Sequence, residues 1–169
     1  KWFAVLEYEV PDPPPVPAPE LASIGNPVGI DLGLKSVIST TDGLRVKPVK
    51  PFKVHEKKLK HLQRNLSRTK KGSKNRVKAI VALNKEHQKV AAIRRDMNHK
   101  LSDQLVAEHD FLVFEDLRIR NMVKNHCLAK AIHDVAWNQL VSFVQYKAAR
   151  DGKLVVLVPP EYTSQECSM

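Results

Sequence analysis

Two carboxylates in this 169-residue sequence stand where they could hold a metal ion together. Asp31 ends the short apolar run VGID just before Gly33, and Glu115 ends the fully apolar run FLVFE. Each run has the composition of a buried strand, and paired strands lie only about 4.8 Å apart. Carboxylates held that close repel each other unless a cation lies between them, and a divalent metal is the usual solution. The sequence therefore predicts a metal site built from Asp31 and Glu115.

Each of the two carboxylates also has a simpler interpretation when taken alone. Asp31 could form an Asx-type turn ahead of Gly33, and Glu115 could be a solvated strand end. Asp116 is predicted to be a structural acceptor that caps the next turn rather than a metal ligand. The seven histidines show no metal-ligand spacing, so they are predicted to be surface or capping residues.

The elements that must position these carboxylates begin with three predicted strands, at 28–31, 35–41 and 44–49. Asp42 and Gly43 provide the turn between the last two strands, as a hairpin requires. A period of about 3.6 residues then predicts one helix from about 55 to 69 and a longer one over 74–108. The buried face of the longer helix is predicted to consist of Ile80, Leu83, Val90, Ile93, Met97, Leu101 and Leu105.

The second half of the sequence predicts a strand at 111–115, a helix over 128–150 and a last apolar strand at 153–158. This last helix is predicted to bury Leu128, Ile132, Val135, Ala136, Leu140, Phe143 and Val144. Trp137 is also predicted to lie in the core, and Cys127 is predicted to fill space by packing. The order β-β-β-αα-β-α-β, with final strands apolar enough to be parallel, predicts an α/β fold with a mixed sheet and flanking helices.

The charge is concentrated in one segment. The chain carries a formal charge of +10, and residues 45–100 hold 19 of its 28 Lys and Arg but only 3 of its 18 acids. An αα-hairpin at about 55–108 would carry most of this charge. The excess of Lys and Arg over acidic residues is too large for ion pairs at i,i+4 spacing to neutralise. A solvated charged face remains the simpler alternative, but contact with a nucleic-acid backbone is favoured. The leading candidates lie at the hairpin tip: Arg64, Arg68, Lys70, Lys71, Lys74 and Arg76.

The ends of the chain differ from this central region. Residues 1–10 are predicted to be the terminal strand of a preceding wedge-type β module, and residues 11–27 a proline-rich linker. Residues 28–169 would form the main domain. The two cysteines suggest no disulfide framework, and neither a signal peptide nor a membrane span is visible, so a reducing cytoplasm is predicted.

Five strings in the sequence together resemble the TnpB (OrfB) family of transposon-encoded proteins, which are relatives of the type V CRISPR effectors. They occur in the family's order, and the resemblance covers nearly the whole chain. The strings are GIDLGLKS, LQRNLSRTKKGSKNR, FEDLRIRNMVKN, LAKAIHDVAW and PPEYTSQECS.

The resemblance implies a ribonuclease-H-like (RuvC-like) domain that cuts DNA under the direction of a guide RNA. It implies that Asp31 and Glu115 are the first two catalytic carboxylates and hold two Mg²⁺ ions, with Mn²⁺ as an alternative. It also implies that Cys167 is a ligand of a structural Zn²⁺ in the full-length protein. The family pattern continues past Cys167 to further cysteines and a third catalytic Asp, so this chain is expected to be incomplete and inactive by itself.

Two other functions are compatible with parts of the sequence. A nuclease-inactive repressor of the same family would bind RNA or DNA without cutting it, although the intact Asp31 and Glu115 argue against that loss. An actin-like ATPase shares the fold class and an IDLG strand, but the later half shows no second glycine-rich phosphate loop. The favoured function is that of an RNA-guided, metal-dependent DNA endonuclease of an insertion sequence.

Overall fold

The computed structural model describes residues 25–117, 122 and 126–159. The predicted strand at 1–10, nearly all of the linker at 11–27 and Cys167 lie outside the described residues, as does the side chain of Cys127. No helix in the described ranges is long and apolar enough to cross a membrane.

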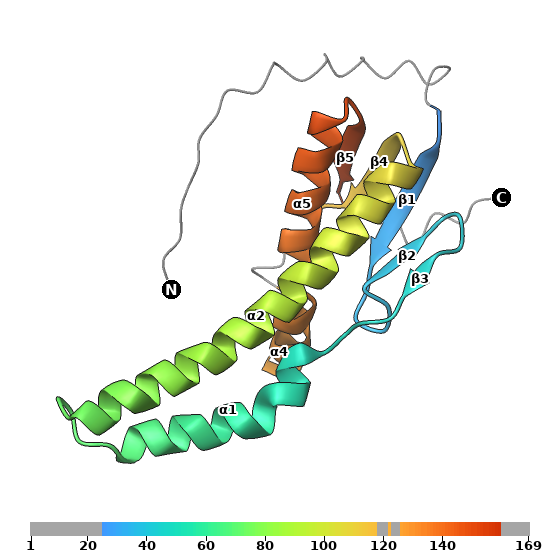
Figure 1. The fold of residues 1–169 in the computed structure, drawn as a ribbon. Coiled ribbons are helices and arrows are strands. Elements are labelled where there is room, and N and C mark those ends of the chain that lie inside the picture. The colour runs from blue at the N-terminus through green and yellow to red at the C-terminus, as the bar shows by residue number, and fades with distance from the viewer. Residues whose placement is uncertain (1–24, 118–121, 123–125, 160–169) are drawn as a thin grey trace.

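The described strands form one mixed sheet in the order β3-β2-β1-β4-β5 (Figure 1). The central strand β1 pairs antiparallel with β2 and parallel with β4, and β4 pairs parallel with β5. The α/β class and the parallel final strands are therefore confirmed. The strands are β1 (Pro27–Leu32), β2 (Ile38–Thr40), β3 (Arg45–Val46), β4 (Phe111–Glu115) and β5 (Leu154–Val158).

Helices cover one face of this sheet. α2 (Lys74–Glu108) and α5 (Trp137–Arg150) lie across the strands, whereas α1 (Pro51–Arg68) and the first half of α2 form a hairpin that extends away from the sheet (Figure 1). α4 (His126–Val135) lies beside the base of this hairpin. The main core lies between the sheet and the ends of α2 and α5, where the buried apolar residues include Ile30, Phe114, Leu105, Leu140 and Val144.

The prediction of a single helix over 128–150 is wrong. Ala136 adopts a left-handed conformation, with φ 55° and ψ 48°, and separates α4 from α5. Its carbonyl oxygen still accepts a bond from the Leu140 backbone N–H, so α5 begins directly after the break. Because alanine is the best helix former, nothing in the local sequence signals this break.

Three other element boundaries differ from the prediction. α1 starts at Pro51 rather than near residue 55, because proline suits the first helical position and Asp134 caps that end. The strands predicted at 35–41 and 44–49 shorten to 38–40 and 45–46. The Gly33 backbone N–H bonds to the Val37 carbonyl oxygen, so a loop replaces the first part of β2.

Two predicted core positions of α2 are also wrong, since Ile80 and Ile93 are each 38% exposed. Where α2 leaves the sheet it packs against α1 through Leu83 and Val90, and contact with a neighbouring helix buries only a narrow stripe. Phe143 is half-buried and stacks on His99 with 4.0 Å between the ring centroids. Trp137 is 2% exposed and lies in the core as predicted.

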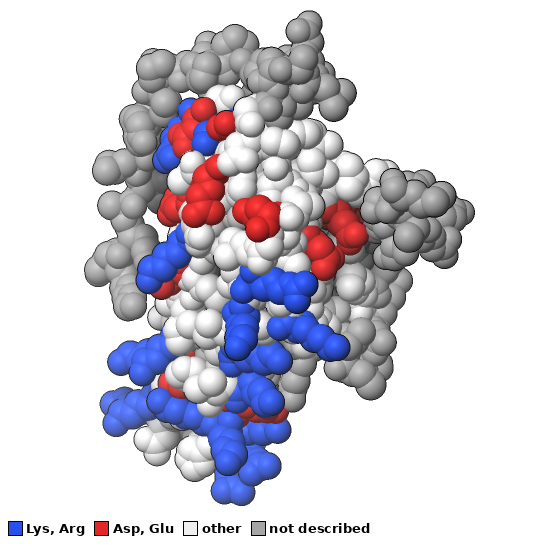
Figure 2. Space-filling view, turned by 90° about the vertical axis from the view of Figure 1, so that its right-hand side faces the viewer, with Lys and Arg blue, Asp and Glu red and all other residues white. Residues whose placement is uncertain are grey.

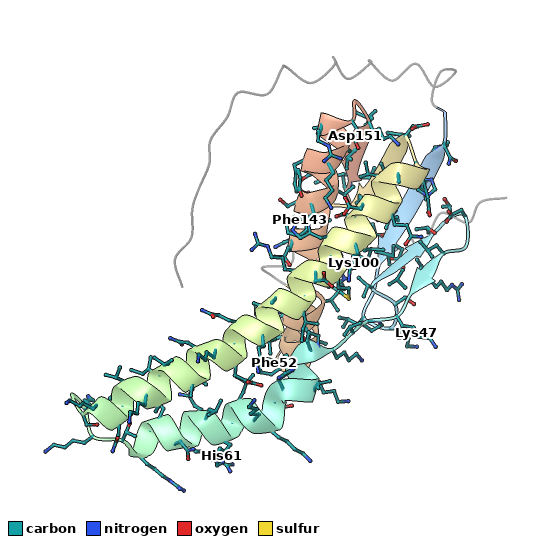
Figure 3. All side chains as sticks on the ribbon, in the orientation of Figure 1. Lys47, Phe52, His61, Lys100, Phe143 and Asp151 are labelled. Atoms are coloured by element: carbon teal, nitrogen blue, oxygen red, sulfur yellow. The ribbon has the colours of Figure 1, made fainter. Side chains whose placement is uncertain are left out.

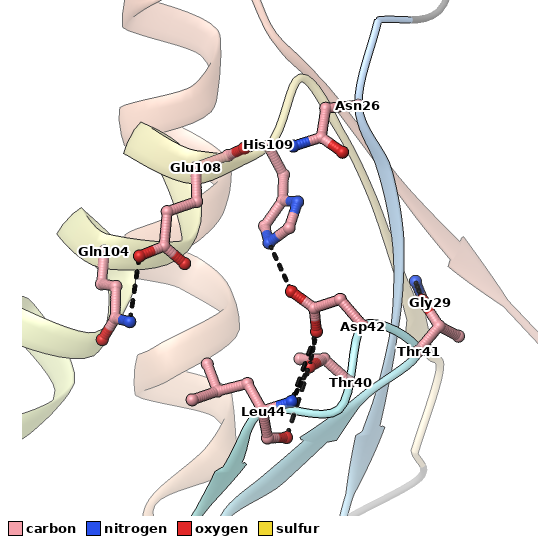
Figure 4. Close-up of polar contacts among 9 residues, drawn as sticks. All are labelled: Asn26, Gly29, Thr40, Thr41, Asp42, Leu44, Gln104, Glu108 and His109. Carbon is pink, nitrogen blue, oxygen red and sulfur yellow. Dashed lines mark hydrogen bonds and ion pairs between the residues drawn. The ribbon is translucent and has the colours of Figure 1, made fainter.

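His109 is the C-cap residue of α2, in agreement with the predicted capping role, but it is buried rather than at the surface. Its ring is buried between the end of α2 and the β2–β3 turn, and its Nε2 lies 3.5 Å from Oδ2 of Asp42 (Figure 4). Asp42 also accepts bonds from the Thr40 hydroxyl and the Leu44 backbone N–H. The Thr40 hydrogen bond, assisted by His109, lowers the pKa of Asp42. These contacts hold the β2–β3 turn against the body of the domain.

Candidate active site

The register of β1 and β4 brings the two predicted carboxylates together. Ile30 pairs with Phe114, so Asp31 and Glu115 follow at equivalent positions on adjacent parallel strands. Ile30 and Phe114 are buried beneath the helices. Because side chains alternate along a strand, Asp31 and Glu115 both belong to the opposite face of the sheet, which none of the described helices covers.

Both carboxylates line one hollow with a volume of about 410 Å³. Asp31 is exposed and Glu115 is half-buried. Sequence reasoning missed three further residues that line this hollow, Ser39, Thr40 and Thr41 on and just after β2. Ser39 lies directly opposite Asp31 in the β1–β2 ladder. The site therefore places small hydroxyl side chains beside the carboxylates.

Gly29 and Thr41 shape the floor of this hollow. The Gly29 backbone N–H donates to Thr41 Oγ1 at 3.1 Å, and the Thr41 backbone N–H donates to the Gly29 carbonyl oxygen at 3.0 Å. A Cβ on Gly29 would come within 3.0 Å of Thr41 Cγ2, so a larger residue would push Thr41 aside. These residues come opposite β1 through the antiparallel pairing of β1 with β2, which the Asp42-Gly43 turn between β2 and β3 does not signal.

The donor set of the hollow suits a hard divalent cation. Two carboxylates supply the oxygen ligands that Mg²⁺ prefers. Within the described ranges, no group of three or more His, Cys, Asp or Glu could hold a metal ion. The residues present thus fit part of a magnesium site and leave room for further ligands.

The basic hairpin is held together from within. The carboxylate of Glu86, 3% exposed, contacts Nδ1 of His55 at 2.6 Å and Nζ of Lys58 at 2.8 Å. These contacts join α2 to α1. The bond from Lys58, followed by that from His55, lowers the pKa of Glu86 to about 2. One of the few acids in this segment therefore has a structural role.

One of the predicted contact residues at the hairpin tip differs from the others in its burial and contacts. Arg76 is half-buried, and its Nη1 donates to the carbonyl oxygens of Leu66 and Thr69 at 3.3 Å each, at the end of α1. The guanidinium of Arg76 thus helps to close the turn. The other five predicted contact residues are exposed: Arg64, Arg68, Lys70, Lys71 and Lys74.

The surface charge is divided between two regions. Lys and Arg gather over the lower part of the molecule in Figure 2, whereas Asp and Glu gather over the upper part. Side chains along α1, such as that of His61, point outward from the hairpin (Figure 3). The hairpin therefore presents a broad positive surface, as its composition of 19 basic and 3 acidic residues over 45–100 requires.

Comparisons with known proteins agree with this arrangement. Residues 5–126 match the OrfB_IS605 family, described as "Probable transposase". Residues 137–169 match the family described as "Cas12f1-like, TNB domain". The first match alone covers more than half of the chain.

Two bacterial relatives align with almost the whole chain. A protein of Streptomyces pristinaespiralis named "Putative RNA-guided DNA endonuclease" is 37% identical over 166 residues, which are 98% of this chain and 40% of the relative. "Putative RNA-guided DNA endonuclease InsQ" of Escherichia coli K12 is 33% identical over 184 residues, covering 99% of this chain and 44% of the relative. The chain thus spans less than half the length of either relative.

A solved structure has a similar fold. A chain of the cryo-EM structure of the Cas12f1–sgRNA–target DNA complex aligns with a TM-score of 0.54 and 16% sequence identity, over 97% of this chain and 41% of that one. At this identity the likeness concerns the fold alone. The transposase-family match over residues 5–126 shows that the chain belongs to the OrfB (TnpB) family.

Proposed function

We propose that this chain is the nuclease part of an RNA-guided DNA endonuclease and that its fold is of the ribonuclease-H-like (RuvC-like) class. The observation that carries the proposal is that Asp31 and Glu115, on adjacent parallel strands, line one hollow. The names of the two bacterial relatives support the same activity. A central strand paired antiparallel on one side and parallel on the other supports the fold class.

Asp31 and Glu115 would hold Mg²⁺ in this hollow. Bound Mg²⁺ supplies Lewis-acid stabilisation of charge on the phosphate and activation of water. The hydroxyls of Ser39 and Thr41 are suited to donate hydrogen bonds to phosphate oxygens, because they line the hollow beside the carboxylates. In the reaction an oxygen from water bonds to phosphorus, the ester bond to the departing oxygen breaks, and that oxygen takes up a proton. A complete metal site needs further ligands besides these two carboxylates.

The basic hairpin would bind the sugar–phosphate backbone of guide RNA and DNA. The exposed residues Arg64, Arg68, Lys70, Lys71 and Lys74 carry the positive charge that this role requires. Sequence would be read by base pairing with the guide, so the hairpin needs no base-reading side chains. Backbone binding by cations releases counterions, and its strength therefore falls steeply with salt.

The experiment uses the protein as its complete reading frame encodes it, together with RNA transcribed from the end of its element. The complex is incubated with Mg²⁺ and DNA that matches or does not match the RNA. We expect cleavage of matched DNA only, and loss of that cleavage when EDTA removes the metal. Cleavage without the RNA, or of unmatched DNA at the same rate, would contradict RNA guidance.

One observation favours a second candidate function. The described residues supply no third acidic, histidine or cysteine ligand beside the two carboxylates. A protein that lacks a complete metal site would bind guide RNA and target DNA and act as a repressor. Tight, guide-dependent binding of matched DNA with no cleavage in Mg²⁺ or Mn²⁺ would favour this repressor over the nuclease.

A further inference from the structure

A second hollow, of about 260 Å³, lies where the carboxyl ends of β1 and β4 meet α5. Leu32, Val141 and Leu157 contribute apolar surface to it. Glu115 lines both this hollow and the one that contains Asp31. Leu32 follows the alternation that buries Ile30, so the second hollow lies on the helix-covered side of the sheet. The two hollows therefore meet at the end of β4.

One wall of the second hollow consists of uncharged polar side chains. Asn138, Ser142 and Gln145 lie four and three residues apart on α5 and so share one face of this helix. The side chains of Asn138, Ser142 and Gln145 are exposed, and none of these side chains makes a hydrogen bond or ion pair with a residue in the described ranges. No described residue therefore occupies the side-chain donors and acceptors of these three residues.

The charges around this hollow argue against a phosphate as its occupant. Among the described residues, no Lys or Arg lines it, and the acidic residues Glu115 and Asp116 do. Acidic groups repel an anion but accept hydrogen bonds from amino or hydroxyl groups. Apolar surface on one side and neutral hydrogen-bonding groups on the other suit a flat ring with a polar edge. The volume is below the 300–1,000 Å³ of a drug-sized site, so a single small group would fill it.

We infer that this hollow holds one nucleoside of the DNA strand being cut, next to the phosphate bound by Asp31 and Glu115. The inference rests on the proposed nuclease function. A strand whose phosphate lies in the first hollow can continue past Glu115 into the second. Gln145, Ser142 and Asn138 contact the base or sugar there, and Leu157 packs against it. The strand must be unpaired at this position, because a base inside a duplex cannot enter a side pocket.

The first test is photo-crosslinking with the Asp31→Ala variant, which is expected to bind DNA without cutting it. Single-stranded target DNA carries one photoreactive base at a series of positions around the cut. We expect one position to crosslink to residues 138–145 of α5, and the Gln145→Ala substitution to reduce that crosslink severalfold. Crosslinks confined to the hairpin would overturn the inference. This readout does not need cleavage, so it separates failure of the hollow from failure of the nuclease proposal.

The second test combines the protein change with a DNA change. Gln145→Ala is expected to slow cleavage of matched DNA about three- to tenfold, the effect of losing one hydrogen bond. An abasic site at the crosslinked position should slow cleavage by the wild-type protein by a similar factor. In the Gln145→Ala variant the same abasic site should cause little further loss of rate. Such non-additivity identifies two groups that contact each other. If the rate losses from Gln145→Ala and from the abasic site multiply at every DNA position, the inference is overturned.

A matched control is Gln104→Ala, which removes an exposed amide on α2 that bonds only to Glu108 among the described residues. It should leave both the cleavage rate and the effect of the abasic site unchanged. Restoring a shorter amide with Gln145→Asn should recover part of the rate. A structural role of Gln145 would instead appear as a lower unfolding temperature, with the effect of the abasic site unchanged, and would contradict the inference.

Discussion

Asp31 and Glu115 stand at equivalent positions on adjacent parallel strands, one residue beyond the paired Ile30 and Phe114. The apolar pair is buried beneath the helices, which fixes the register of the two strands. A slip of one residue in either strand would turn its carboxylate toward the core. The same packing that stabilises the sheet therefore sets the position of both carboxylates on the face that none of the described helices covers.

Asp134 joins α4 to the start of the basic hairpin. Its carboxylate oxygens accept bonds from the backbone N–H groups of Phe52 and Lys53, at 2.9 and 3.3 Å. Asp134→Ala is expected to reduce the free energy of unfolding by about 1–2 kcal/mol, because it leaves donors at the helix start without an acceptor. Urea unfolding measures this. Asp96→Ala, which removes an exposed carboxylate paired with Lys100, should cost less than about 0.5 kcal/mol.

Ala136 provides a test of backbone strain. A left-handed conformation costs a residue with a Cβ about 1–2 kcal/mol, and glycine avoids this cost. Ala136→Gly is therefore expected to raise the free energy of unfolding by up to about 1 kcal/mol after the extra freedom of the unfolded chain is subtracted. Ala148→Gly, at a buried position inside α5, should lower it by about 1 kcal/mol or more. Equal losses in both variants would contradict the strained conformation at Ala136.

The stability of the hairpin should depend on pH through Glu86. Its pKa is about 2 in the folded protein against an ordinary 4.5, so the folded state favours the charged form. The stabilisation is therefore fully present above pH 4.5 and is lost as the pH falls toward 2. Denaturant unfolding at several pH values should show that the free energy of unfolding falls more steeply with decreasing pH in wild type than in Glu86→Gln. A control, Glu108→Gln on the exposed side of α2, should retain the wild-type profile.

The hairpin tip should dominate the salt dependence of nucleic-acid binding. Replacing Lys70, Lys71 and Lys74 with Glu is expected to weaken binding and to reduce the slope of log K against log salt by about 0.7–0.9 for each lost phosphate contact. Lys100→Glu is a control, because that ammonium already pairs with Asp96. An unchanged slope in the triple variant would mean that these lysines form only a solvated face.

Much of this fold could be predicted because local sequence patterns indicate its strands. The apolar runs ending at Asp31 and Glu115 gave two strands with nearly correct bounds, and the Asp42-Gly43 turn gave the hairpin. Their position on one face depends on strand pairing, which the sequence indicates only indirectly. Ser39 and Thr41 were missed because hydroxyl residues in a strand carry no signal until their partner strand is known.

The remaining differences arise from tertiary packing. Ala136 adopts a conformation that its own helix propensity opposes, at a junction after which the chain changes from contact with α1 to contact with α2 and β5. Ile80 and Ile93 follow helical spacing but lie outside the narrow stripe of α2 that packs against α1. The burial of His109 also depends on contact between residues far apart in the sequence, at the β2–β3 turn and the end of α2. A linear pattern carries no information about these neighbours.

The central claim is that Asp31 and Glu115 act together on the phosphate, and it is tested most directly by comparing cleavage with binding. Asp31→Asn and Glu115→Gln keep the shape of each side chain and remove its charge. In the guide-loaded protein with Mg²⁺, each variant is expected to cut matched DNA at least about 100-fold more slowly, since the charge stabilises the transition state. DNA affinity should stay within about threefold of wild type, because phosphate contacts elsewhere supply it. Cleavage at the wild-type rate in either variant would contradict the claim.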